Sequence, residues 1–231
     1  FLLNAFCQDE NTTIDLTGIN VIENKAFNHC KAKEIINADS VDNIISAAFD
    51  NSFFYNKKVL KNQCVVIGHY LLKADETAYR LEIPSNVEAT YVNVHLNKVK
   101  EVVVHNLKIL ECILDLPQKL IIAKDTPFFS KISKLKMKGL KYIDVEDGNP
   151  FYSSENGVLF TKNKKYLLKF PPGRTGLYKI PEGVNTIDEN SFAFSNIEEV
   201  IMPSTMRNLK TFAFYNSYLK SVDFGSGLER I

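Results

Sequence analysis

A motif that recurs about every 22 residues is the feature of this chain that most constrains its fold. The pattern I-x-x-x-[AS]-F occurs at 22–27, 44–49 and 187–192, and Leu replaces Ile in the copy at 209–214. Its phenylalanines are 21 or 22 residues apart within two groups, which are Phe6, Phe27 and Phe49, and then Phe192 and Phe214. A repeat of this length predicts a solenoid, in which each coil packs only on its neighbours and equivalent side chains form columns.

A second motif has the same period. It reads I-P-x-x-V at 83–87 and 180–184 and M-P-x-x-M at 202–206. Short apolar-x-apolar segments at 102–104, 135–137, 143–145, 200–202 and 222–224 each follow another apolar position by about three residues. This L-x-x-L-x-L frame is typical of leucine-rich repeats. The sequence therefore predicts a leucine-rich-repeat solenoid of short parallel β-strands, joined by irregular or short helical turns.

The period is interrupted near 53–81 and near 157–180, where we expect β-hairpin insertions. The first is predicted to have strands at 70–73 and 79–84 around a turn at 74–77. The second is predicted to turn at 161–165. Residues 105–139 keep apolar segments but lack the phenylalanine motif. We expect residues 1–231 to form a single solenoid that is a fragment of a longer chain.

Composition excludes several classes of protein. The chain is 45% hydrophobic and 24% charged with a net charge of +1, so disorder from charge excess is not expected. Near-neutrality argues against nucleic acid as a partner. No apolar run approaches the roughly 18 residues of a transmembrane helix, so direct membrane insertion is not expected. A signal peptide is expected to be either absent or already removed.

Two long segments resemble a known family. Residues 183–214 and 140–184 are similar to the BspA-like, or Treponema-type, leucine-rich repeats and to the hairpin segment that recurs in them. The resemblance implies a right-handed solenoid, an extracellular or cell-surface location, a role as an adhesin and no catalytic residues. Asp188 stands where the family commonly has glycine, and Ser195 where it commonly has cysteine.

The sequence offers no pattern for catalysis, a metal or a cofactor, so we expect no enzyme activity and no cofactor. The four histidines fall in unrelated phases of the repeat, without an H-E-x-x-H pair. His29 and Cys30 are adjacent, but neighbouring residues in a coil usually point in different directions. Cys30 shares its repeat position with Ser52, Ser195 and Ser217, which favours a small buried side chain. A disulfide or a metal ligand remains the alternative for Cys30.

Candidate binding residues follow from strand alternation, since the middle residue of each short strand should face outward. These residues are Asp15, Glu82, Val103, Ile121, Lys136, Asp144, Lys179, Ile201 and Asp223. Val103, Ile121 and Ile201 are apolar, and the first two are predicted to form a small contact patch unless the insertions cover them. Lys134, Lys136 and Lys138 are predicted to share one face, which could bind a polyanion such as a sulfated glycan or could simply be solvated.

Three functional hypotheses follow. The first is an extracellular, non-catalytic interaction module of the adhesin type, with a protein or glycan ligand on host matrix or neighbouring cells. The second is a structural spacer or stalk that binds nothing itself. The third is a targeting arm of a larger surface enzyme.

Overall fold

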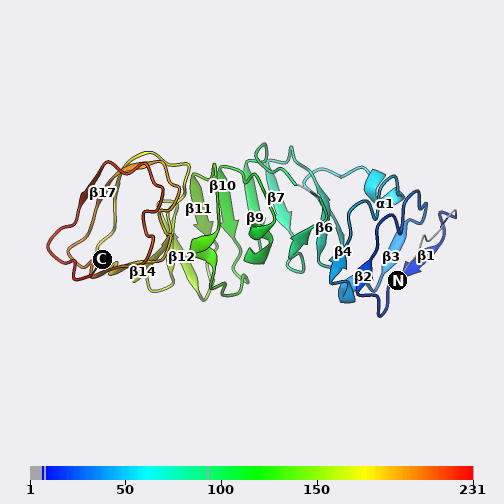
Figure 1. Ribbon diagram of the computed structural model, residues 1–231, viewed down its shortest axis with the longest axis horizontal. Helices are drawn as coiled ribbons and strands as arrows, with labels where there is room; N and C mark the ends of the chain where they lie inside the picture. Colours follow the sequence, from blue (N-terminus) through cyan, green and yellow to red (C-terminus); the bar gives the residue numbers. More distant parts are fainter. Residues whose placement is uncertain (1–6, 8, 93, 231) are drawn as a thin grey trace.

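The computed structural model describes residues 7, 9–92 and 94–230. The chain winds into an elongated β-solenoid of about ten turns, with its two ends at opposite ends of the spiral (Figure 1). The predicted leucine-rich-repeat solenoid is thereby confirmed. Of the predicted core residues, Phe6 lies outside the described residues.

One strand from most coils joins what we call the long ladder, which consists of three parallel sheets with the orders β1-β3, β7-β9-β10-β11 and β15-β17-β19. Its strands are β1 (Thr13–Asp15), β3 (Glu34–Ile36), β7 (Arg80–Ile83), β9 (Glu101–Val104), β10 (Lys119–Ile122), β11 (Tyr142–Val145), β15 (Gly176–Lys179), β17 (Ile197–Ile201) and β19 (Ser221–Asp223). The alternation of the sequence explains the orientation of these strands. In β9, for example, Val102 and Val104 enter the core and Val103 lies on the other face.

A short ladder runs along the other side of the coils, with the parallel pairs β2-β4, β6-β8 and β14-β16-β18. Its strands are β2 (Val21–Ile22), β4 (Asn43–Ile44), β6 (Tyr70–Ala74), β8 (Ala89–Thr90), β14 (Tyr166–Lys169), β16 (Thr186–Ile187) and β18 (Asn208–Leu209). In the described residues, helical structure is limited to α1 (Phe53–Asn56) and the 3₁₀ turns Ala38–Ser40, Leu107–Glu111 and Ile132–Lys134. The Ser52 hydroxyl accepts from the Tyr55 N–H and so caps α1.

Antiparallel strand pairs interrupt the regular winding at two places. The C-terminal hairpin consists of β13 (Val158–Thr161) and β14, joined by residues 162–165, and β12 (Tyr152–Glu155) pairs with the outer edge of β13. The N-terminal hairpin consists of β5 (Cys64–Ile67) and β6. Its turn is Gly68-His69, so the predicted pairing of 70–73 with 79–84 is wrong. Residues 80–83 instead continue the long ladder as β7, because their alternating Leu81 and Ile83 enter the core.

The phenylalanines of the repeat stack in columns through the core. The rings of Phe27 and Phe49 lie 5.2 Å apart, centroid to centroid, and those of Phe192 and Phe214 lie 4.8 Å apart. Phe170 extends the second column at 4.9 Å from Phe192. Offset stacking of this kind adds about 0.5–1.5 kcal/mol beyond the burial of the rings.

Each phenylalanine motif is flanked by two residues with left-handed backbone, two positions before the ring and two after it. The pairs are Lys25 and His29, Ala47 and Asn51, Asn190 and Phe194, and Phe212 and Asn216, with φ between 50° and 62°. These reversals fold the turn around the ring. Phenylalanine is an unfavourable choice for such a backbone, since a side chain there costs roughly 1–2 kcal/mol.

The first coils meet the rest of the molecule at what we call the N-terminal seam, between residues 7–56 and 61–230. Among the described residues, no strand pair and no backbone–backbone hydrogen bond crosses it. Side chains cross it instead. The Tyr70 hydroxyl donates to the Asp42 carbonyl at 2.6 Å, and the Phe49 N–H donates to the Tyr91 hydroxyl at 3.1 Å. Ile67 and Leu72 pack into the N-terminal core.

Candidate functional site

The outward face of the sheet β7-β9-β10-β11, which we call the charged face, is the broadest ordered surface of the long ladder. Strand register aligns its side chains in two rows across the four strands. The first row is Arg80, Glu101, Lys119 and Tyr142, and the second is Glu82, Val103, Ile121 and Asp144.

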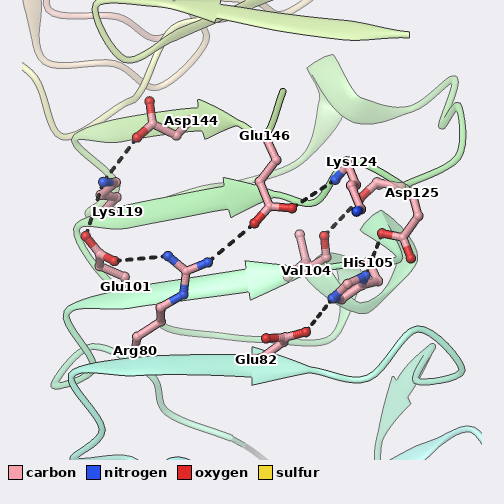
Figure 2. Close-up of polar contacts among 11 residues, drawn as sticks. Arg80, Glu82, Glu101, Val104, His105, Lys119, Lys124, Asp125, Asp144 and Glu146 are labelled. Carbon is pink, nitrogen blue, oxygen red and sulfur yellow. Dashed lines mark hydrogen bonds and ion pairs between the residues drawn. The ribbon is translucent and has the colours of Figure 1, made fainter. Parts of the chain in front are cut away.

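Ion pairs connect neighbouring strands across this face (Figure 2). Arg80 bridges Glu101 and Glu146 with N–O distances of 3.7 and 3.4 Å. Lys119 lies 3.1 Å from both Glu101 and Asp144. The hydrogen bond from Lys119 to Asp144 is the main reason that the pKa of this lysine is raised. The charged groups are therefore held at fixed positions rather than left free in solvent.

His105 continues the face at the end of β9. Its Nδ1 lies 2.6 Å from Asp125 and its Nε2 lies 2.9 Å from Glu82 (Figure 2). Burial lowers the pKa of His105, but the hydrogen bonds to Glu82 and Asp125 outweigh it, and the net shift is upward. The hydrogen bond between His105 and Asp125 also lowers the pKa of Asp125. Carboxylates on both ring nitrogens stabilise the charged imidazolium relative to the neutral ring.

The expectation that Val103 and Ile121 form an exposed patch is wrong. Val103 is 1% exposed and Ile121 is 5% exposed, and with Ala123 they form a small separate apolar cluster. On the same face, Glu101 and His105 flank Val103 along β9, and Lys119 flanks Ile121 along β10. These longer side chains form ion pairs on the same face, and the apolar cluster among them is almost fully shielded from water.

The lysine stripe lies elsewhere on the molecule. Lys134, Lys136 and Lys138 are exposed and alternate with buried Leu135 and Met137, as expected. Residues 135–137 are nevertheless not a strand, because they lie midway along the coil between β10 and β11 and meet no strand partner.

Two of the three lysines already have partners. Lys134 pairs with Glu189 at 3.1 Å, and the Lys136 ammonium lies 5.9 Å from the centre of the Phe194 ring. Ile201, the remaining predicted contact residue, is half-buried between exposed Lys179 and Asp223.

An exposed aromatic cluster escaped the sequence analysis. Phe194 and Phe212 are 49% and 60% exposed, and their rings lie 5.6 and 5.5 Å from the ring of Tyr215. Both phenylalanines occupy the left-handed positions that flank the motif. The sequence did contain a signal for this cluster, since Phe194 lies two residues after the column residue Phe192. Two other repeats place asparagine there (Asn51 and Asn216), which adopts left-handed backbone more easily than phenylalanine.

The His29-Cys30 pair points in two directions, since His29 is exposed and Cys30 is buried. Burial raises the pKa of the Cys30 thiol to about 11. All four cysteines are free thiols. Within the described ranges, no group of three or more His, Cys, Asp or Glu side chains is placed to hold a metal ion.

The stacked coils, two parallel ladders and phenylalanine columns define a leucine-rich repeat protein. A model of the BspA-type leucine-rich repeat region matches residues 3–109 and 177–231 in six copies. The chain therefore belongs to the BspA-type leucine-rich repeat family. This class serves as protein-interaction modules that present an extended surface, and its members are typically non-catalytic.

Three solved structures are similar to this chain. The pneumococcal vaccine antigen PcpA is 22% identical over 94% of this chain and 51% of its own, with a TM-score of 0.48. A leucine-rich repeat protein from Eubacterium ventriosum is 19% identical over 60% of this chain and 45% of its own, with a TM-score of 0.44. A leucine-rich cell surface protein from Faecalibacterium prausnitzii is 19% identical over 91% of this chain and 52% of its own, with a TM-score of 0.43.

The chain thus spans about half the length of these structures. No curated protein matches it. In the described part of the chain, no helix has both the length and the apolarity needed to cross a membrane.

Proposed function

We propose that this protein is an extracellular, adhesin-type interaction module that uses the charged face to bind a protein or glycan on host matrix or neighbouring cells. The observation that carries the proposal is the fixed arrangement of charge on this face. Arg80, Glu101 and Lys119 alternate in sign along one row and are held by cross-strand ion pairs. A partner with the complementary pattern would find the charges pre-organised, which favours specificity and fast association.

The spacer function is the second candidate, and one observation favours it. The charges of the face pair with one another, so the surface is satisfied without a ligand. A stalk needs only such a solvated, self-satisfied surface on an elongated solenoid.

Binding to immobilised matrix proteins and sulfated glycans separates the two candidates. The test variant is Glu101→Gln with Lys119→Gln, which removes the central pair without changing net charge. The matched control is Glu198→Gln with Lys220→Gln, which removes a 2.7 Å ion pair from another coil. The control pair is exposed and the test pair is partly covered, and both variants are expected to stay folded because glutamine keeps the length of the glutamate side chain.

We expect the test variant to lose at least about tenfold in affinity, equivalent to about 1.4 kcal/mol, while the control binds like the wild type. Equal binding by both variants would exclude the charged face as the contact surface. Absence of wild-type binding to every matrix protein and glycan would favour the spacer.

A further inference from the structure

The first strand of the N-terminal hairpin has an edge with no strand partner in the described structure. β5 pairs only with β6, in the sheet β5-β6-β8, whereas the corresponding strand β13 lies between β12 and β14. The correspondence is fixed by register, since Val65 lies opposite Lys73 as Leu159 lies opposite Lys169. An irregularity follows that position in both hairpins. β5 therefore lacks the neighbour that β12 gives to β13.

Residues 58–61 occupy the place in the chain that corresponds to β12. Asn62 and Asn156 both adopt left-handed backbone in the turn before the first hairpin strand, with φ of 59° and 50°. The four residues before Asn62 are 58–61, and the four residues before Asn156 are 152–155, which form β12. Residues 58–61 form no strand, and Leu60 is 58% exposed. The segment that could have covered β5 therefore does not pair with it.

A cavity of about 620 Å³ lies beside this uncovered edge. Its walls are β5, β3 and the segment containing Lys57, Lys58 and Leu60. β3 also has one strand partner in the described part of the chain, which is β1. Cys64, Val65 and Val66 of β5 are only half-buried, whereas β13 is buried from Val158 to Phe160. We call this cavity the β5 groove.

The walls of the groove are held in place before any partner arrives. At one end, the Asn62 N–H donates to the Asp75 carboxylate at 2.9 Å and the Asp75 N–H donates to the Gln63 carbonyl at 3.0 Å. At the other end, Gly68 approaches the Ala38 carbonyl so closely that a Cβ would lie 2.4 Å from its oxygen. A pre-formed groove avoids the ordering cost that weakens many interactions.

We propose that the β5 groove binds an extended, acidic segment of a partner protein, which adds an antiparallel strand to β5 as β12 does to β13. Main-chain hydrogen bonds to an exposed strand edge supply affinity in this mode of recognition. Lys57 and Lys58 line the wall of the groove beside the open edge, and these two lysines favour an acidic segment. Lys33 already pairs with Glu10, whereas neither Lys57 nor Lys58 forms an ion pair with a described residue. This surface is separate from the charged face, so either site can fail without the other.

The probe is a synthetic peptide with the sequence of residues 150–156, which include β12, and two glutamates at each end. Titration into ¹⁵N-labelled protein should give saturable shifts of the 64–67 amides. A second peptide carries the same side chains with alternate backbone amides N-methylated, and should bind at least about tenfold more weakly because ladder hydrogen bonds are lost. A third peptide has lysines in place of the added glutamates and should also bind more weakly.

A grafted protein supplies the converse test. Lys58→Tyr, Val59→Ser, Leu60→Ser and Lys61→Glu together place the β12 sequence beside β5, and should reduce peptide affinity at least tenfold. Lys61→Glu alone changes a residue outside the groove lining and should reduce affinity far less than the full graft. No shift at 64–67 with millimolar peptide, or equal binding of the N-methylated peptide, would overturn the proposal. Concentration-dependent shifts at 64–67 without peptide would show that a second copy of the chain occupies the groove instead.

Discussion

The N-terminal hairpin β5–β6 and the C-terminal hairpin β13–β14 carry the same Tyr-Leu-Leu-Lys segment in their second strand, at 70–73 and 166–169. Both second strands join the short ladder in the same register, with Tyr70 opposite Ala89 and Tyr166 opposite Thr186. The first strands differ, because β12 seals β13 while β5 stays open on one side. The local sequence thus sets the register of the second strand in each hairpin. Whether the first strand is buried depends on the segment that packs beside it.

The lysine of the shared segment illustrates the same lesson. The Lys169 ammonium is buried and donates to the Ser133 and Asn190 carbonyls at 2.7 and 3.2 Å. Burial lowers its pKa to about 8. Lys73, its equivalent, is half-buried and lies 4.4 Å from the centre of the Tyr55 ring. One residue type in one register therefore has two environments, which the following experiments compare.

The largest difference is expected between Phe160→Ala and Val66→Ala, which truncate equivalent positions of the two hairpins. Phe160 is fully buried, so its truncation should lower the free energy of unfolding by about 3–5 kcal/mol. Val66 is half-buried, and its truncation should cost about 1 kcal/mol. Urea unfolding measures both. Equal losses would show that β5 is as well covered as β13.

The next comparison is between Lys169→Met and Lys73→Met as the pH rises. The folded pKa of Lys169 is about 8 and the ordinary pKa of a lysine is 10.5, so above pH 8 the unfolded chain binds more protons. The titration of Lys169 should therefore raise the free energy of unfolding as the pH rises, by at most about 1.4 kcal/mol per pH unit. Relative to wild type, Lys169→Met should lose this rise between pH 8 and 9.5, and Lys73→Met should keep it. Identical pH profiles for the two variants would contradict the buried environment of Lys169.

The hairpin turns are expected to differ by a smaller amount. Gly68 has φ of +53° and no room for a Cβ, so Gly68→Ala should destabilise the N-terminal hairpin by about 2 kcal/mol. Lys164 in the C-terminal turn already adopts φ of 55° as a non-glycine residue, and Lys164→Ala should cost only a few tenths of a kcal/mol. Hydrogen exchange of the 64–74 amides measures the loss. Unchanged protection in Gly68→Ala would show that the contact with Ala38 does not hold the turn.

The smallest effect is expected from His69→Gln. The two ring nitrogens of His69 lie 2.8 and 3.0 Å from the Asn86 and Asp39 carbonyls, and only the imidazolium can donate to both. The hydrogen bond to Asn86 is the main cause of the raised pKa of His69. Because the folded pKa is raised, this stabilisation is present below about pH 6.5 and is lost as pH rises through the folded value.

The loss of stability in His69→Gln should therefore be about 1 kcal/mol or less at pH 5.5, and smaller still at pH 8.5. Urea midpoints at the two pH values measure it. A loss that grows with pH would contradict the doubly donating imidazolium.

Much of the fold could be predicted because a repeat forces equivalent residues into contact. Spacing alone placed Phe27 over Phe49 and Phe192 over Phe214, and alternation placed Val102 and Val104 in the core. The N-terminal hairpin was missed because Gly-His is a weak turn signal beside the more polar segment at 74–77.

The candidate site was harder to predict than the fold. Alternation identified the face on which Val103 and Ile121 lie, but could not show that both side chains would be almost fully buried there. The β5 groove depends on a segment that fails to pair. No local pattern in residues 58–61 reveals that failure, and only comparison with the C-terminal hairpin does.

The N-terminal seam also determines how the rod would respond to tension. A pull on its two ends loads every boundary between coils, and most boundaries resist through ladder hydrogen bonds. The seam resists through side chains such as Tyr70 and Tyr91 and through core packing alone. It should therefore part first, leaving two folded pieces joined by residues 57–60, a tether of about 13 Å when extended.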